Sequence, residues 1–163
     1  GNSNQNNLLD WKDAEKGVPW GVLLLFGGGL SLAAAAQSTG LAAWIGSLMP
    51  VGLSLILLVF LFTALIIFLT ELTSNLATTA TFLPIVAIIA TQFGFDPLLL
   101  TAAIAIAASC AFMLPVATPP NAIVFGSELI KVPQMMKAGI VLNLIAIVIV
   151  SLASIYLVPK FLI

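Results

Sequence analysis

The sequence predicts an all-α membrane protein that contains one re-entrant helical hairpin and one broken transmembrane helix. Apolar residues make up 61% of the 163 residues, and charged residues make up only 7%, whereas about 25% of residues are charged in soluble proteins. The few charges are separated by long uncharged stretches, each of which exceeds the roughly 20 residues that span a bilayer. These stretches are 17–70, 72–95, 97–127 and 138–159.

The same composition argues against several other classes of protein. A water-soluble enzyme does not have so few charges, and the single cysteine, Cys110, cannot form a disulfide scaffold. A net charge of −1 without a basic cluster argues against nucleic-acid binding. A membrane enzyme is not expected either, because no His, Lys or Asp is predicted near Ser74 to act as its base.

The first two elements are a polar N-terminal segment at 1–17 and a transmembrane helix at 18–37. Trp11 and Trp20 flank four of the five charges of the polar segment, as aromatic anchors do at a membrane surface. The helix contains three consecutive glycines at 27–29, and such small residues let a neighbouring helix approach closely in a membrane.

An interfacial helix and a hairpin are expected next. Residues 38–50 place Leu41 and Trp44 on one face of an uncharged amphipathic helix, which we expect to lie along the membrane surface. Residues 51–93 hold two apolar arms joined by a polar tip at 70–79. So short a polar link does not easily cross a headgroup layer, so we expect a re-entrant hairpin whose tip is shielded by protein at membrane depth.

The last two elements are a broken transmembrane helix at 97–130 and a final transmembrane helix at 139–159. Two consecutive prolines remove two backbone donors, so we expect a helix that runs to Ala117 and a break at 118–121. Lysines and a proline mark 131–137 as a surface loop.

The polar tip and the break together predict a binding site. A helix that ends inside a membrane presents free carbonyl groups to a cation, and one that begins there presents N–H groups to an anion. Secondary transporters build their sites from such discontinuous helices. The side chains around both segments are neutral oxygen and amide groups, which suit a hard monovalent cation and a carboxylate rather than zinc or copper. They are Thr70, Thr73, Ser74, Asn75, Thr78, Thr79, Thr118 and Asn121.

Glu71, beside the tip, has two interpretations that the sequence leaves open. An ionisable residue at membrane depth is a functional hypothesis by default, and Glu71 would then carry a proton. Alternatively, it is a structural carboxylate that caps or braces the hairpin. Asn143 is expected to form a hydrogen bond between helices, and Cys110 is expected only to pack.

These residues resemble the divalent anion:sodium symporter family, which carries dicarboxylates, citrate or sulfate. The similarity covers nearly the whole chain and is most specific in Thr-Glu-Leu-Thr-Ser-Asn at 70–75 and Met-Leu-Pro-Val-Ala-Thr-Pro-Pro-Asn-Ala-Ile-Val-Phe-Gly-Ser at 113–127. The family has two inverted repeats, each with a re-entrant hairpin and a broken helix. The resemblance therefore implies a partial inverted-repeat transporter: most of the second repeat, without the N-terminal repeat, from a protein that forms homodimers.

The resemblance also implies roles for individual residues. The residues that would bind one sodium ion are Thr70, Asn75 and Ala117. Those that would line the substrate carboxylate are Ser74, Asn75, Thr118 and Pro119. The family tip reads Ser-Asn-Thr, but Leu76 follows Asn75 here, so a hydroxyl group is replaced by an isobutyl group. This departure puts the substrate contact, and with it the dicarboxylate specificity, in question.

The leading hypothesis is part of a secondary active transporter that moves a dicarboxylate-like anion with sodium across a cell membrane, the bacterial inner membrane by resemblance. Sodium is the coupling ion, and no cofactor is expected. One alternative is an ion transporter of similar architecture for an inorganic anion or for proton coupling through Glu71. Another is a non-transporting membrane subunit. Because the chain begins with Gly1, we expect it to be part of a longer protein.

The lysines orient the chain, because cytoplasmic loops of membrane proteins are enriched in positive residues. A cytoplasmic N-terminal segment places four lysines inside and only Lys160 outside. With Cys110 replaced by serine, a cysteine introduced at Thr39 or Gln92 should therefore react with an impermeant thiol reagent added to intact cells, and one at Pro133 should not. Labelling of position 133 from outside would contradict the orientation.

Overall fold

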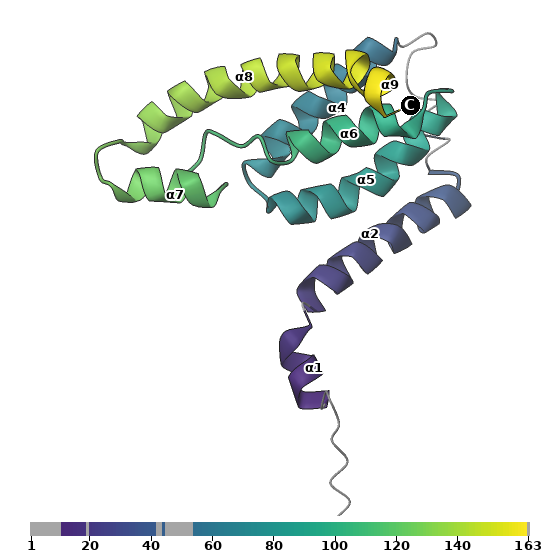
Figure 1. Cartoon of the computed structure of the whole chain (residues 1–163), viewed down its shortest axis with the longest axis horizontal. Helices are drawn as coiled ribbons and strands as arrows, with labels where there is room; N and C mark the ends of the chain where they lie inside the picture. The colour runs from purple at the N-terminus through teal and green to yellow at the C-terminus, as the bar shows by residue number, and fades with distance from the viewer. Residues whose placement is uncertain (1–10, 19, 42–43, 45–53, 163) are drawn as a thin grey trace, which may run out of the picture.

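The computed structural model describes residues 11–18, 20–41, 44 and 54–162. All regular structure in this part of the chain is helical, which confirms the all-α class (Figure 1). The helices are α1 (Trp11–Gly17), α2 (Trp20–Ser38), α4 (Leu55–Thr70), α5 (Asn75–Gln92), α6 (Pro97–Ala107), α7 (Pro119–Gly126), α8 (Val132–Tyr156) and α9 (Val158–Phe161).

Helices α4, α5, α6 and α8 form a bundle, and α2 packs against its α5 side (Figure 1). Although a short turn joins α4 to α5, the two arms have different neighbours. Helix α4 lies against α8 and α6, whereas α5 lies against α6 and α2. The α4–α5 turn, the end of α6 and the start of α8 all lie toward the same end of the bundle (Figure 1).

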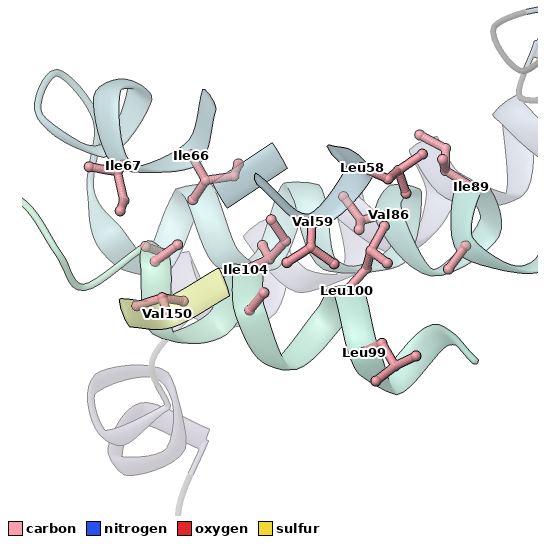
Figure 2. Close-up of a cluster of buried hydrophobic side chains, with 14 of the residues drawn as sticks. Leu58, Val59, Ile66, Ile67, Val86, Ile89, Leu99, Leu100, Ile104 and Val150 are labelled. Atoms are coloured by element: carbon pink, nitrogen blue, oxygen red, sulfur yellow. The ribbon is translucent and has the colours of Figure 1, made fainter. Parts of the chain in front are cut away.

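The centre of the bundle is aliphatic. Leu58 of α4, Val86 of α5 and Leu100 of α6 are fully buried and lie next to one another (Figure 2). Lipid tails are as apolar as these side chains, so burial of aliphatic groups gives van der Waals contacts but little preference for one helix arrangement over another. Close approaches of backbone at glycines and a few buried polar contacts therefore select the arrangement.

The outer face of α8 is also aliphatic. Its exposed side chains include Ile140, Val141, Leu144, Ile145, Val148 and Ile149. In the described part of the chain, the segments 75–92 and 132–161 are long and apolar enough to cross a membrane. An exposed aliphatic face of this size suits contact with lipid rather than with water.

The hairpin arms end close to the expected tip, but the tip itself is shorter than expected. Helix α4 ends at Thr70 and α5 begins at Asn75, with Ser74 as its N-cap. The following threonines belong to the first turns of α5, because the hydroxyl of Thr78 donates to the carbonyl of Ser74 at 3.1 Å and that of Thr79 to the carbonyl of Asn75 at 2.8 Å. The polar tip is therefore 71–74 rather than 70–79.

The expected position of the helix break is wrong. Helix α6 ends at Ala107 instead of Ala117, and an irregular segment occupies 108–118. The two prolines do not interrupt a helix at 118–121 but begin α7, with Thr118 as the N-cap. This placement is favourable, because proline fits the first turn of a helix, where its missing N–H group needs no partner.

The expected loop at 131–137 and the start of the last helix at 139 are also wrong. Helix α8 begins at Val132, and Pro133 lies in its first turn, where proline is tolerated. The side chain of Gln134 accepts a hydrogen bond of 2.9 Å from the N–H group of Lys131, which caps this start. The predicted interfacial helix at 38–50 lies mostly outside the described residues.

Helix α2 lies directly against the backbone of α5 at Gly29. A Cβ atom added at Gly29 would lie 2.3 Å from the carbonyl oxygen of Ala80, whereas one added at Gly28 would have nothing within 4 Å. We predict that Gly29→Ala lowers the stability in detergent by about 1–3 kcal/mol through overpacking. Gly28→Ala should be neutral or stabilising by up to about 1 kcal/mol through helix propensity. Thermal unfolding of both variants at matched detergent concentration tests the contact, and equal melting temperatures would contradict it.

Candidate functional site

The carboxylate of Glu71 makes the most extensive set of side-chain hydrogen bonds near the two predicted polar segments. Glu71 is the C-cap of α4 and is only 4% exposed. Its Oε1 atom accepts hydrogen bonds from the N–H groups of Phe112 at 2.8 Å and Met113 at 2.9 Å. Its Oε2 atom accepts one from the N–H group of Leu114 at 3.0 Å. A fourth bond, of 2.8 Å, comes from the side-chain amide of Asn143 in α8 to Oε1.

These contacts explain where α6 ends. The N–H groups of residues 112–114 donate to Glu71 rather than to carbonyls of a continued helix. Pro115 follows and has no N–H group. The carbonyl groups of Ala111 and Leu114 are bound in turn by the side-chain amide of Asn121, each at 3.0 Å. The side chains of Glu71 and Asn121 therefore pair five backbone groups of the irregular segment, as an apolar environment favours.

Helix α8 packs directly onto this irregular segment. A Cβ atom at Gly139 would lie 2.3 Å from the carbonyl oxygen of Phe112 and 2.5 Å from the Cα atom of Met113. Asn143 lies one turn further along the same face of α8. One face of α8 therefore makes two contacts. Gly139 packs against the backbone of the break, and Asn143 binds the carboxylate of Glu71, which itself binds that backbone.

Of the two interpretations of Glu71, this geometry supports the brace. The carboxylate accepts all four of its hydrogen bonds, and it braces the break between α6 and α7 rather than only the hairpin. The predicted hydrogen bond of Asn143 between helices is confirmed, with Glu71 as its partner. Cys110 lies partly buried at the start of the break, where its thiol contacts the carbonyl of Ile106 at 3.4 Å.

A pocket of about 490 Å³ lies between the hairpin tip and the end of the break. It is lined by Leu72, Thr73, Ser74, Asn75, Leu76, Val116, Ala117 and Pro119. The structure thus brings together four of the site residues expected from the sequence, which are separated by some forty positions in the chain: Ser74, Asn75, Ala117 and Pro119. Thr118 is not among the lining residues, and its hydroxyl instead accepts a hydrogen bond of 3.4 Å from the N–H group of Asn121.

Thr70 lies behind the pocket and is fully buried. Its Oγ1 atom is 2.8 Å from Oδ1 of Asn75 and 2.7 Å from the carbonyl oxygen of Ala108. A hydroxyl group has one hydrogen, so it donates to only one of these two oxygens at a time. The hydroxyl oxygen of Thr70, Oδ1 of Asn75 and the carbonyl oxygen of Ala108 therefore lie close together, and the Thr70 hydroxyl supplies one hydrogen for the two contacts between them.

The remaining residues of the tip are held by their own hydrogen bonds. The hydroxyl of Thr73 lies 3.0 Å from the carbonyl of Leu69 and 2.6 Å from the hydroxyl of Thr78. The hydroxyl of Ser74 accepts from the N–H group of Ala77 at 3.5 Å as the α5 N-cap. Both α5 and α7 begin at the pocket wall, and the N-terminus of a helix carries a partial positive charge.

Sequence reasoning missed three contributors to this region. Leu72 and Val116 line the pocket, and Ala108 supplies its carbonyl oxygen to Thr70. An aliphatic side chain gives no signal that its position borders a site. The neighbouring polar tip and the Thr-Pro-Pro string, however, indicate the two segments in which the first two residues lie.

Apolar helices, a hairpin turn and an interrupted helix that meet at a neutral polar pocket are features of polytopic membrane proteins with discontinuous helices. Residues 5–161 match the family described as "Sodium:sulfate symporter transmembrane region", and the chain belongs to this family. It is therefore a multi-pass membrane protein.

The chain is also similar to curated transporters from staphylococci. It is 47% identical over 154 residues to the sodium-dependent dicarboxylate transporter SdcS of Staphylococcus saprophyticus, a match that covers 93% of this chain and 30% of the relative. It is 49% identical over 154 residues to the transporter of the same name from Staphylococcus aureus, with 93% and 29% covered. The chain therefore spans less than a third of the length of these relatives.

Proposed function

We propose that the chain is part of a secondary active transporter that moves a dicarboxylate-like anion together with sodium. The observation that carries the proposal is the pocket where the starts of α5 and α7 meet neutral oxygen groups. The names of the staphylococcal relatives support both the substrate class and the coupling ion.

Sodium would bind beside the pocket through Thr70, Asn75 and Ala117. The oxygens of Thr70 and Asn75 lie 2.8 Å apart, and the backbone of Ala117 belongs to the opposite wall. Neutral oxygen atoms are suitable ligands for a hard monovalent cation. An ion at this place would join the hairpin tip to the break, and it would offset the surplus of acceptor oxygens around the hydroxyl of Thr70.

The anion would bind at the helix starts through Ser74, Asn75, Thr118 and Pro119. The residues that line the pocket include no lysine or arginine. The charge of a carboxylate would therefore be balanced by the partial positive charge of the helix N-termini and by bound sodium. This arrangement couples the two ligands, because each would improve the electrostatic environment of the other.

The rest of the transporter follows from the same proposal. The hairpin at 51–93 is re-entrant, and the chain is most of the second of two inverted repeats. The N-terminal repeat supplies the other half of the site, the complete protein forms homodimers, and it resides in the bacterial inner membrane. The short coverage of the relatives supports a missing repeat, since about 70% of their length lies outside the match.

Sodium-dependent uptake by the full-length transporter in proteoliposomes tests the proposal. We expect succinate uptake in a sodium gradient, no uptake when choline replaces sodium, and loss of uptake in Asn75→Ala. Asn75 has both an acceptor and donors, so it can contact the cation through its oxygen and the anion through its amide. The exposed Ser127→Ala variant, outside the pocket, is the matched control and should retain activity.

Three results would contradict the proposal or part of it. Equal uptake in sodium and choline, with a proton gradient required instead, would favour the proton-coupled alternative. Uptake of sulfate in preference to succinate would favour an inorganic anion, which the description of the family includes. Full activity of Asn75→Ala would remove the pocket from the transport mechanism.

Leu76 provides a test of substrate contact. It lines the pocket and is 42% exposed, and it cannot donate a hydrogen bond to an anion. We predict that Leu76→Thr tightens succinate binding by about 10- to 150-fold, the equivalent of one hydrogen bond to a charged group at about 1.5–3 kcal/mol. Uptake measured at several succinate concentrations and saturating sodium gives the affinity.

Leu76→Ala is the control for this substitution, because it removes the isobutyl group without adding a hydroxyl. Tightening in Leu76→Thr alone would establish a hydrogen bond to the substrate. An equal change in both variants would instead show that Leu76 acts through its bulk. An unchanged affinity in Leu76→Thr would contradict the contact.

A further inference from the structure

Glu71 is connected to both walls of the pocket. On one side it immediately precedes Leu72, the first residue of the tip that lines the pocket. On the other side its Oε2 atom binds the N–H group of Leu114, and the carbonyl of Leu114 accepts a 3.2 Å hydrogen bond from the N–H group of Ala117. The carboxylate of Glu71 is therefore linked through Leu114 to Ala117, which lies in the opposite wall of the pocket.

The start of α7 depends on the same residue of the break. The carbonyl of Leu114 also accepts a hydrogen bond of 3.0 Å from the side-chain amide of Asn121, in the first turn of α7. Displacement of Leu114 would therefore move both Ala117 and the N-terminus of α7. Because Glu71 holds Leu114 from the end of α4, it fixes the spacing between the tip and the break.

Helix α8 keeps the carboxylate in this position. Asn143 donates to Oε1, and Gly139 leaves no space between α8 and the backbone of Phe112. Both are buried, and neither lines the pocket. Any influence of Asn143 on ligand binding would therefore act through Glu71 and the break.

We propose that Glu71, held by Asn143, is a positioning residue that sets the distance between Asn75 and Ala117 and thereby the affinity for sodium. The inference rests on the proposed function, and it assigns to the carboxylate a role other than proton transfer. The affinity for a cation that binds to both walls depends directly on the distance between them. The affinity for the anion depends less on this distance, because each helix N-terminus acts on the anion from its own wall.

Two substitutions disturb this contact to different degrees. Glu71→Gln keeps the shape but has one acceptor oxygen, and its amide group would face backbone N–H donors. Asn143→Ala keeps the carboxylate and its three backbone hydrogen bonds and removes only the support from α8. Ser154→Ala is the matched control, because it also removes a buried hydrogen bond of α8, to the carbonyl of Leu99, far along the helix from the pocket.

The experiment measures succinate uptake by the full-length transporter in proteoliposomes at increasing sodium concentration and at several pH values. We expect Asn143→Ala to raise the half-saturating sodium concentration about tenfold, the effect of one hydrogen bond to a charged group. Glu71→Gln should raise it further or abolish uptake. The succinate KM at saturating sodium should change less, and the pH profile should stay that of the wild type. Ser154→Ala should lower the melting temperature and leave the sodium dependence unchanged.

Other outcomes separate the failure of this inference from that of the proposed function. If Glu71→Gln does not assemble, Asn143→Ala decides the question alone. An unchanged sodium dependence in Asn143→Ala, with a melting temperature lowered as in Ser154→Ala, would overturn the positioning role while the wild type still requires sodium. A pH profile that is lost in Glu71→Gln would overturn it in favour of proton transfer. Sodium-independent uptake by the wild type would overturn the proposed function itself.

Discussion

Three consecutive backbone N–H groups, those of residues 112–114, are freed where α6 ends, and the carboxylate of Glu71 binds all of them. An unpaired polar group in an apolar environment costs about 2–7 kcal/mol, so the break would not persist without an acceptor. The dependence is mutual, because a buried carboxylate is itself unstable without donors. It is also placed at the C-terminus of α4, the end of a helix that disfavours negative charge. The break, the α8 packing and the pocket wall all follow from this one exchange of hydrogen bonds.

The sequence predicts the segments of the site better than their boundaries. The polar string 70–75 and the prolines at 119–120 identify the tip and the restart of the helix, and the structure brings both to one pocket. The end of α6 was misplaced because the acceptor that replaces its helical carbonyls, Glu71, is 41 to 43 positions away in the chain. Local propensity contains no information about so distant a partner. The start of α8 was misplaced for a local reason, since a proline near lysines suits either a loop or the first turn of a helix.

The bundle also shows which contacts make helix packing specific in a membrane, where lipid tails can replace aliphatic side chains as neighbours. The buried Leu, Ile and Val residues of α4, α5 and α6 are no more apolar than lipid tails, so their contacts do not by themselves favour one helix partner over another. Among the described residues, the contacts that distinguish one partner from another include Gly29 against the backbone of Ala80, Gly139 against the backbone of Phe112, and Asn143 and Ser154 against oxygen acceptors. Three of these four contacts join α8 to α4, to α6 or to the irregular segment at 108–118, and the contact of Gly29 joins α2 to α5.

The divergent arms of the hairpin have a mechanical consequence. Both arms contact α6, but only α4 packs against α8 and only α5 packs against α2, and residues 71–74 join the two arms along the chain. Movement of α4 relative to α5 would therefore require a change in backbone torsion within these four residues. Three of the four line the pocket, and the fourth is Glu71. The residues that join the two arms also line the pocket, so a ligand bound there would restrict the movement of one arm relative to the other.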